Sequence, residues 1–381
     1  MNANMKKVLL VERCKLDLLG GIERYNNYLI DILNKYYDVE IHILITENYQ
    51  LDERVNEYKN CKYFYVDFSK LKLGKNKIAH AFKEYDLIKK TRKKFNKLLN
   101  QNRYNLIINS SFINLSPNKK LQNLFLIQHL SLDAYVGKYR TANIFVYLFY
   151  KFIKNTNLLK NILNIVVYDY INKLEFEKYN SYANYYAIPL CIEDFNNKPI
   201  IFPNLTNRQG IVYIGRINAT QKNVDKLYEI NKFINCIYFY GQSYNPIEDK
   251  IKNKLISQNS YCGFFTDREN LQIMLNKYKF CILYSNYEGF GFSLVEALSV
   301  GLPLIVKNTF TSASFLCNEK TGLLLPKDTT IDQDIKLIEK FINMDNDTYK
   351  QYVSDCIDFY NKNLLYKNFE EKWKEIFKKF L

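Results

Sequence analysis

Short apolar runs alternate with longer amphipathic stretches along most of this chain. In the first half, the stretch from Ile22 to Lys35 has apolar residues at helical spacing and predicts a helix. Strands that alternate with helices favour a parallel, doubly wound α/β sheet. The apolar runs of this half predict strands at residues 8–11, 39–45, 62–66, 106–109, 124–129, 165–168 and 185–189.

The same alternation restarts after a break in the middle of the chain. Residues 188–200 contain two of the seven prolines and show little periodicity, which is typical of a linker. We therefore expect a first domain over 1–190, a linker over 191–205, a second domain over 206–360 and a C-terminal helix over 361–381. The second half predicts strands at residues 210–216, 236–241, 261–264, 280–284 and 304–306.

The predicted C-terminal helix carries an apolar stripe, which needs a surface to pack on. The residues of this stripe are Phe369, Trp373, Ile376, Phe377 and Phe380.

Composition limits the classes of protein that fit. With 381 residues, of which 48% are hydrophobic, the chain has enough apolar material for two domain cores, and this excludes a disordered protein. Its eight cysteines form no C-x-x-C pair, which favours reduced thiols and a cytoplasmic protein. No run approaches the roughly 18 apolar residues that span a bilayer, and the N-terminus lacks the apolar core of a signal peptide.

The formal net charge is +15, which predicts an anionic partner. The candidates are a nucleic acid, an anionic lipid and a phosphorylated substrate. Much of this charge is clustered between residues 70 and 97, where apolar residues recur at helical spacing and predict a basic amphipathic helix. Three interpretations fit such a helix. It is a solvated face of the protein, it binds a membrane surface, or it binds a nucleic acid. No recognition motif accompanies the charge, so we expect an anionic membrane rather than a nucleic acid. The membrane-surface candidates are Lys89, Lys90, Arg92, Lys93 and Lys94.

A second segment, residues 142–153, is aromatic and apolar but too short to span a membrane. It is either a core helix or an apolar surface near a lipid acceptor.

The most specific motif follows the predicted strand at 280–284. Glu288 and Glu296 lie eight positions apart around a Gly-Phe-Gly-Phe turn, and a short helix and another strand come next. This order places Glu288 at the carboxyl end of a strand, where open α/β sheets bind ligands, and Glu296 inside the following helix. The free amides of that helix suit a phosphate. The two glutamates alone fit an ordinary βα loop equally well.

A second motif follows the first strand of the second half. Arg216 and Lys222 lie six positions apart, one at the end of the strand and one after a short loop. A guanidinium and an ammonium at such an edge suit a diphosphate. Taken alone, they also fit two surface cations in a protein with 54 lysines and arginines.

In order and spacing, these motifs resemble glycosyltransferase family 4, which comprises retaining sugar-nucleotide transferases of the GT-B fold. The resemblance covers nearly the whole chain and is strongest from about 210 to 326. It rests on Gly20-Gly-Ile-Glu-Arg24, on Gly215-Arg216 with Lys222, and on Glu288-Gly-Phe-Gly with Glu296-Ala-Leu and Gly301-Leu-Pro303. The resemblance implies two Rossmann-like domains that face a central cleft, with the C-terminal helix returning to the N-terminal domain.

The resemblance also implies roles for individual residues. Arg216 and Lys222 would neutralise the leaving diphosphate, and Glu296 would hold the ribose hydroxyls. Glu288 would contact the donor sugar, and His129 would contact a sugar hydroxyl near the reaction centre. The remaining donor-binding residues would be Gly20, Gly21, Gly215, Gly263, Gly289, Phe290, Gly291, Phe292, Ser293 and Leu294.

The mechanism implied is sugar transfer with retention at the anomeric carbon, with the leaving phosphate as the base and no metal or cofactor. We interpret two D-x-D strings, Asp332–Asp334 and Asp345–Asp347, as helix caps and solvated turns rather than metal ligands. One segment departs from the family. An acidic residue is frequent shortly after the strand at 304–306, but here residues 308–314 contain none.

The function expected is transfer of a sugar from a UDP-linked nucleotide donor to a surface-glycan or lipid-linked acceptor at the cytoplasmic membrane face. Two alternatives stay open at this point. One is another GT-B enzyme such as a nucleotide-sugar epimerase or a phosphorylase, and the other is a non-enzymatic basic protein that binds membrane or nucleic acid.

Overall fold

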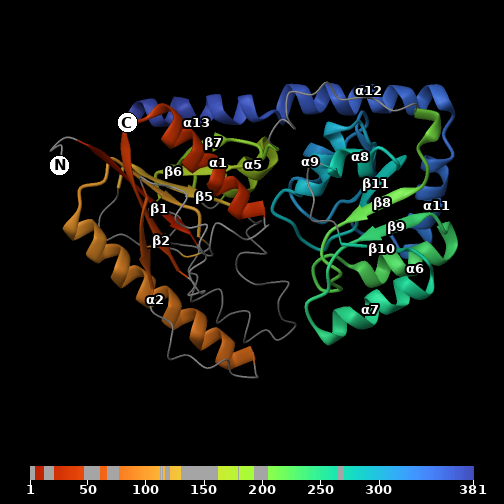
Figure 1. The fold of residues 1–381 in the computed structure, drawn as a ribbon, viewed down its shortest axis with the longest axis horizontal. Helices are drawn as coiled ribbons and strands as arrows, with labels where there is room; N and C mark the ends of the chain where they lie inside the picture. The colour runs from red at the N-terminus through yellow and green to blue at the C-terminus, as the bar shows by residue number, and fades with distance from the viewer. Residues whose placement is uncertain are drawn as a thin grey trace. The chain divides into compact units, whose positions relative to one another are not determined.

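The chain divides into two compact units in the computed structural model (Figure 1). Unit one comprises Met1–Ile188 and Glu370–Leu381, and unit two comprises Pro189–Phe369. The boundary at Pro189 lies just before the predicted linker, most of which falls outside the described residues. The structure describes residues 5–12, 21–46, 61–66, 77–111, 113, 115, 121–129, 162–178, 180–192, 205–264 and 270–381.

Unit one contains a parallel sheet of seven strands in the order β3-β2-β1-β4-β5-β6-β7. Every strand predicted for the first half is present, with ends that shift by no more than two residues. The prediction succeeded because strands covered on both faces are continuous apolar runs. The strands are β1 (Lys6–Glu12), β2 (Val39–Ile45), β3 (Cys61–Tyr65), β4 (Leu106–Asn109), β5 (Leu124–Ile127), β6 (Asn164–Val167) and β7 (Asn184–Ala187).

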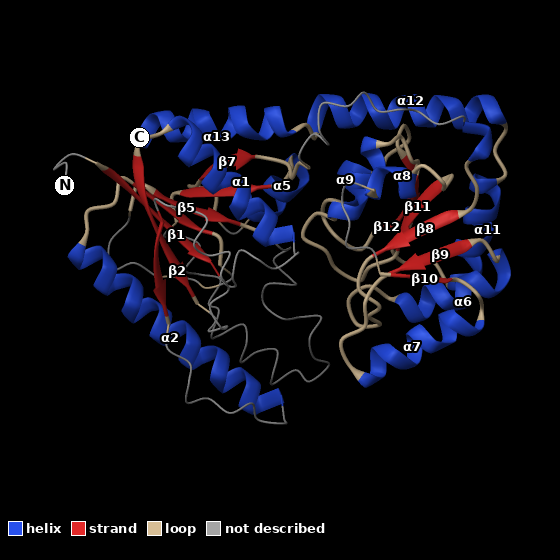
Figure 2. Ribbon diagram, viewed as in Figure 1, coloured by secondary structure: helices blue, strands red, loops and turns tan. Residues whose placement is uncertain are grey.

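Helices cover both faces of this sheet (Figure 2). Successive side chains of β5 point to opposite faces of the sheet. Leu124 packs in one cluster with Phe95 of α2. The next side chain, Phe125, has its ring 5.4 Å from that of Phe380 in α13. Leu126, on the same face as Leu124, packs with Phe176 of α5, so α2 and α5 lie on this face. Trp373 of α13 bonds to Tyr25 of α1, so α13 and α1 lie on the Phe125 face. Their bounds are α1 (Gly21–Tyr36), α2 (Lys77–Gln101), α5 (Tyr170–Glu177) and α13 (Tyr366–Phe380).

The C-terminal helix packs on the N-terminal unit, as predicted. Trp373 is fully buried, and its indole N–H donates a hydrogen bond of 3.2 Å to the Tyr25 hydroxyl. The Phe377 ring lies edge-on to Tyr37 at 5.6 Å. Within α13, Phe369 falls just before Glu370, where unit one resumes, so the predicted stripe divides between the two units.

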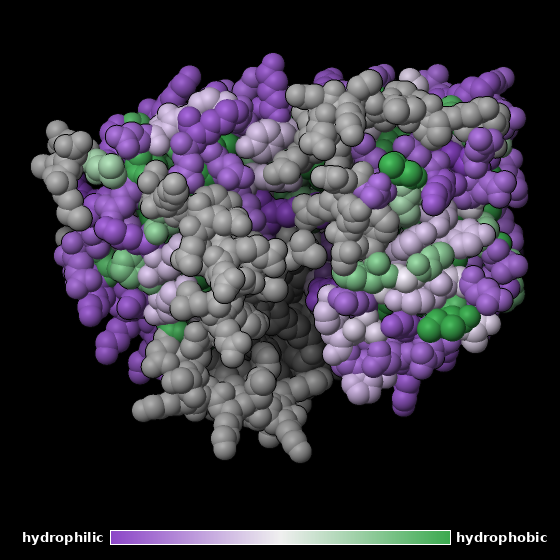
Figure 3. Space-filling model, in the orientation of Figure 1, coloured by the Kyte–Doolittle hydropathy of each residue, from purple (hydrophilic) through white to green (hydrophobic). Residues whose placement is uncertain are grey.

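The basic helix α2 has the predicted amphipathic pattern, but its apolar side is already occupied. Ile88, Phe95 and Leu98 are buried against the sheet in the core of unit one. Hydrophilic residues predominate over the described part of its outer side, among a few apolar ones (Figure 3). Over residues 88–101 of this helix, whose side chains the structure describes, the apolar side is therefore not available to a membrane, and charge remains for such an interaction.

Unit two contains a parallel sheet of six strands in the order β10-β9-β8-β11-β12-β13. The five predicted strands are present, and β13 is an edge strand that the pattern did not predict, since its run of three leucines has no diagnostic period. The strands are β8 (Ile211–Ile214), β9 (Ile237–Tyr240), β10 (Tyr261–Gly263), β11 (Phe280–Leu283), β12 (Leu304–Lys307) and β13 (Gly322–Leu325).

Helices also cover both faces of the second sheet. The α6 helix packs against α7 and α11, and α9 packs against α12. Right-handed crossovers place these two groups on opposite faces, because the strand order reverses between β8 and β11. The elements are η4 (Leu205–Asn207), α6 (Val224–Ile234), α7 (Pro246–Ser257), α8 (Leu271–Leu275), α9 (Phe292–Ser299), α10 (Ala313–Leu316), α11 (Ile331–Ile342) and α12 (Asn346–Asn363). Within the described ranges, every helix is too short or too polar to cross a bilayer.

The two D-x-D strings have different environments. Asp345 caps α12 by accepting hydrogen bonds from the amides of Asp347 and Thr348, as predicted. The prediction is wrong for Asp334, which is fully buried and forms a 2.6 Å ion pair with Lys307. The helix that carries Asp334 is capped instead by Thr330.

Candidate functional site

The two motifs of the second half meet at one edge of the second sheet. Strand β8 pairs directly with β11, and the strand order reverses between them. Arg216 and Lys222 follow β8, while Glu288 and the N-terminus of α9 follow β11. The crevice at such a reversal, outside the carboxyl ends of the strands, is where open α/β sheets bind ligands.

Lys222 and Glu288 form an ion pair at this edge. The Lys222 ammonium donates to Glu288 Oε1, and the Ser285 hydroxyl donates to the same oxygen at 2.7 Å. The side chains of Lys222 and Glu288 are only 13% and 9% exposed, so water screens the pair weakly. The sequence motifs treated these residues separately, and the structure joins them.

Gly215 leaves room for the Tyr213 hydroxyl at the strand end. A Cβ atom at this position would lie 2.8 Å from the Tyr213 hydroxyl and 3.6 Å from Lys222 Cε. Burial, together with the charge of Glu288, raises the pKa of Tyr213, so its hydroxyl stays protonated and donates 2.7 Å to the Arg216 carbonyl. The exposed Arg216 guanidinium donates 2.6 Å to Gln221.

Amide side chains that the motif analysis missed join the two loops. Asn223 and Asn286 exchange reciprocal amide hydrogen bonds of 2.7 and 2.8 Å. The Asn286 backbone N–H also donates 2.7 Å to the Gln221 carbonyl. Asn223 has φ of 50°, a left-handed conformation that asparagine tolerates better than most residues. An asparagine at a loop-to-helix junction was the one sequence signal for this role.

Helix α9 begins at a glycine and has no side-chain cap. Gly291 has φ of 104°, and its Cβ position lies 3.3 Å from a Leu294 methyl group. Phe290 and Leu294 are buried, so they offer only backbone groups to a ligand. Gly289, Phe292 and Ser293 are half-buried beside them, and Glu296 lies one turn further along the helix, 5% exposed.

Residues 308–314, the segment that departs from the family, supply hydroxyl groups that hold the Glu288 loop in place. The Thr309 hydroxyl donates to the Ser285 carbonyl, and the Ser312 hydroxyl donates 3.5 Å to the Gly289 carbonyl. These bonds hold the backbone of the loop without a carboxylate from residues 308–314.

Gly263 lies farther from these residues. It ends β10, and β9 separates that strand from β8. Its carbonyl accepts 2.9 Å from the Gly241 amide, and its φ is 103°. A Cβ there would meet nothing within 4 Å, so the backbone conformation and not space favours glycine.

In unit one, His129 follows β5 and is 2% exposed. Its Nε2 lies 2.6 Å from the Ser110 hydroxyl, and its Nδ1 bonds to the Tyr168 hydroxyl. Burial lowers the pKa of His129 to about 3, so the imidazole is neutral. Gly21 is the first residue of α1, and Gly20 lies outside the described residues.

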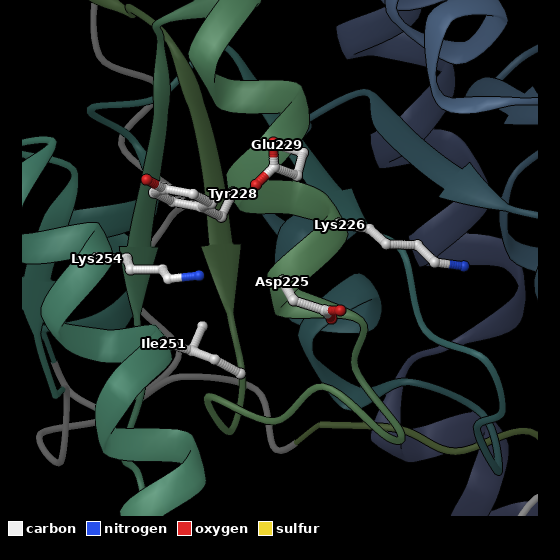
Figure 4. A pocket seen from close by; sticks show the side chains of 6 residues that line it. All are labelled: Asp225, Lys226, Tyr228, Glu229, Ile251 and Lys254. Atoms are coloured by element: carbon white, nitrogen blue, oxygen red, sulfur yellow. The ribbon is translucent and has the colours of Figure 1, made fainter.

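A separate groove of about 250 Å³ lies between α6 and α7 (Figure 4). None of its lining residues belongs to the motifs. Its two carboxylates and two lysines balance in charge, so the groove favours neither an anionic nor a cationic ligand. The Lys226 side chain extends away from Lys254 in this view. The lining residues are Asp225, Lys226, Tyr228, Glu229, Ile251 and Lys254.

Two doubly wound units, with Arg216, Lys222 and a glycine-started helix at the strand reversal of the second, are the arrangement expected of a GT-B glycosyltransferase. Residues 196–355 match the family described as "Glycosyl transferases group 1". These residues, which make up most of unit two, are a group 1 glycosyltransferase domain. The match confirms the predicted fold and enzyme class and leaves aside the non-enzymatic alternative.

Solved structures of low sequence identity share the fold. Sucrose-phosphate synthase from Thermosynechococcus elongatus matches with a TM-score of 0.77, 16% identity and 98% of each chain covered. WaaG, a glycosyltransferase involved in lipopolysaccharide biosynthesis, matches at 0.67 with 12% identity, covering 97% of this chain and 99% of WaaG. Anabaena HepE in complex with UDP and glucose matches at 0.65 with 13% identity, covering 98% and 100%. No curated protein matches the sequence.

Proposed function

We propose that this chain is a retaining glycosyltransferase that moves a sugar from a UDP-linked donor to a glycan or lipid-linked acceptor. The observation that carries the proposal is the meeting of Arg216, Lys222, Glu288 and the start of α9 at the strand reversal of the second sheet. This edge of the sheet therefore has both positively charged groups that suit a diphosphate and a carboxylate that suits a sugar hydroxyl.

The proposed chemistry places the charged groups where charge develops. As the bond between the anomeric carbon and the diphosphate breaks, negative charge grows on the leaving phosphate, and Arg216, Lys222 and the first amides of α9 stabilise it. The leaving phosphate then accepts the proton of the incoming hydroxyl on the same face of the sugar, which gives retention. These cations take the part that a metal plays in other transferases, so the proposal includes neither metal nor cofactor.

Glu288 and Glu296 have separate roles in this proposal. Glu288 Oε1 already accepts from Lys222 and Ser285, which orients the carboxylate and leaves Oε2 for a donor-sugar hydroxyl. Glu296, one turn into α9, accepts from the two ribose hydroxyls. Uracil as the base is suggested by HepE, which was solved with UDP and glucose.

Nucleotide binding tests the proposal. We expect UDP to raise the thermal midpoint of the wild type, since a ligand at 100 times its Kd adds about 2.7 kcal/mol to stability. Glu296→Gln and Arg216→Ala are expected to lose most of this rise. Lys226→Ala is the matched control, because it removes an exposed lysine from the same region and should keep it. If neither UDP nor GDP stabilises the wild type, the proposed donor site is wrong.

We further propose that α2 holds the enzyme on an anionic membrane by charge alone, at the cytoplasmic face and with no nucleic-acid partner. Lys89, Lys93 and Lys97 are exposed along one side of α2, whereas Lys90 pairs with Asp86 at 2.8 Å. Each exposed lysine near an anionic surface contributes about 1 kcal/mol. Such binding weakens with salt and requires no inserted side chain.

Vesicle sedimentation tests this second proposal. We expect binding to vesicles with anionic lipid at low salt, little binding at 0.5 M salt, and none to neutral vesicles. Reversing the charge of Lys89, Lys93 and Lys97 to glutamate should abolish binding. The same change at Lys336, Lys340 and Lys350, which are exposed in unit two, alters the net charge equally and should not. Equal loss in both variants would mean that overall charge, and not α2, attracts the vesicles.

A further inference from the structure

Five buried polar side chains form a continuous series along the carboxyl edge of the first sheet. They surround the strand reversal between β1 and β4, the position that corresponds to the donor edge in unit two. None is more than 2% exposed. They are Glu12 at the end of β1, Asn26 in α1, Ser110 after β4, His129 after β5 and Tyr168 after β6.

The hydrogen bonds of this series have one direction. The Ser110 hydroxyl has one proton and donates it to Asn26 Oδ1 at 2.6 Å. His129 Nε2, which lies 2.6 Å from the same hydroxyl oxygen, must therefore be the donor of that bond. A neutral imidazole then has no proton on Nδ1, so Nδ1 accepts from the Tyr168 hydroxyl.

The two ends of the series agree with this direction. Burial raises the pKa of Tyr168, so its hydroxyl keeps the proton that it donates to His129. At the other end, Asn26 Oδ1 accepts from Ser110. The Asn26 amide nitrogen is therefore the group that donates to the Glu12 carboxyl group. Burial also lowers the pKa of His129 to about 3, so no second proton enters the ring near neutral pH.

We propose that Ser110 and Tyr168 are positioning residues that hold His129 as a neutral imidazole with its proton on Nε2. The inference rests on the proposed function and on the contact with a sugar hydroxyl that the family resemblance implies for His129. A substrate oxygen that reaches the ring then meets a hydrogen-bond donor, and it replaces the Ser110 oxygen as acceptor while Ser110 keeps its bond to Asn26. His129 orients the sugar in this arrangement and takes no proton from it.

Nitrogen NMR of the imidazole rings tests the tautomer without substrate. The chain has three histidines, His42, His80 and His129, so the spectrum is simple to assign with single substitutions. We expect His129 in the wild type to show a neutral Nε2–H pattern that is unchanged between pH 5 and 8. Tyr168→Phe removes the donor to Nδ1 and should spread the proton over both nitrogens. A wild-type Nδ1–H pattern, or a charged ring at pH 7, would overturn the proposal.

Kinetics test whether the tautomer matters for transfer. Tyr168→Phe and Ser110→Ala should lower kcat by about 10- to 100-fold, as small misplacements near a reaction centre do, with UDP affinity unchanged. Tyr104→Phe is the matched control, because the Tyr104 hydroxyl makes the equivalent hydrogen bond to His42 Nδ1, at 2.7 Å, away from the sheet reversal. Variants with a mixed tautomer but normal kcat would overturn the positioning role. If the wild type transfers no sugar from any nucleotide donor, the proposed function fails and the positioning role with it, whereas the NMR result stands independently.

Discussion

Replacement of Lys222 by methionine is expected to lower kcat for sugar transfer by about 100- to 1000-fold, which is the effect of removing one preorganised charge donor from a transition state. The physical reason is that Lys222 is largely buried and held beside the Gly215 turn by its contact with Glu288. Its charge is therefore in place before the diphosphate leaves. Steady-state transfer with a UDP-sugar measures the effect, and Lys226→Met is the control for the loss of a positive charge.

Lys222→Met also leaves the Glu288 carboxylate with one hydrogen-bond donor, so we expect a loss of stability of about 1–3 kcal/mol. The double variant Lys222→Met/Glu288→Gln removes the unpaired charge and should recover most of this stability. It should not recover activity, because the lysine is still absent. Normal transfer by either variant would exclude Lys222 from the reaction.

Replacement of Lys307 by methionine is expected to destabilise unit two by about 3–5 kcal/mol, the usual result of breaking a buried ion pair. Lys307 is 4% exposed and Asp334 is fully buried, and the ammonium lies 2.6 Å from the carboxylate. Tyr284 also donates to this carboxylate, but a phenol hydroxyl carries no charge to balance it. Methionine therefore leaves an uncompensated charge in the core.

Urea denaturation followed by circular dichroism measures this loss. Trp373, the one tryptophan of the chain, lies in unit one, so its fluorescence follows that unit separately. The control is Lys350→Met, which breaks an exposed pair with Asp347 at 3.0 Å and should change stability by less than about 0.5 kcal/mol. Lys307→Met/Asp334→Asn should recover stability relative to Lys307→Met. A single variant within about 1 kcal/mol of the wild type would mean that the pair contributes little.

Much of the fold could be predicted because the pattern of apolar residues reflects burial directly. Strands β2 and β4 were predicted with their bounds, since both consist mainly of apolar residues and are covered on both faces. Strand β13 was missed because Gly322–Leu325 becomes a strand only by pairing with β12. The motifs predicted which residues gather after β8 and β11, because the strand ends of a doubly wound sheet meet at one edge.

The partners of individual side chains could not be predicted in this way. Sequence patterns gave the charge of Lys222 and Glu288 but not their ion pair, and they placed Asp334 in a solvated turn although it is buried against Lys307. They predicted a basic amphipathic helix at a membrane surface, but they could not show that Phe95, on the apolar side of α2, is buried in unit one.

The sequence by itself determined the two α/β units, the position of the candidate donor edge and the types of residue found there, because periodicity and local motifs depend on neighbours along the chain. Only the tertiary structure decided the charge balance at Lys222, the partners of Asp334 and the proton position on His129. These properties depend on contacts between residues far apart in sequence, such as Ser110 with Asn26, and on burial that excludes water.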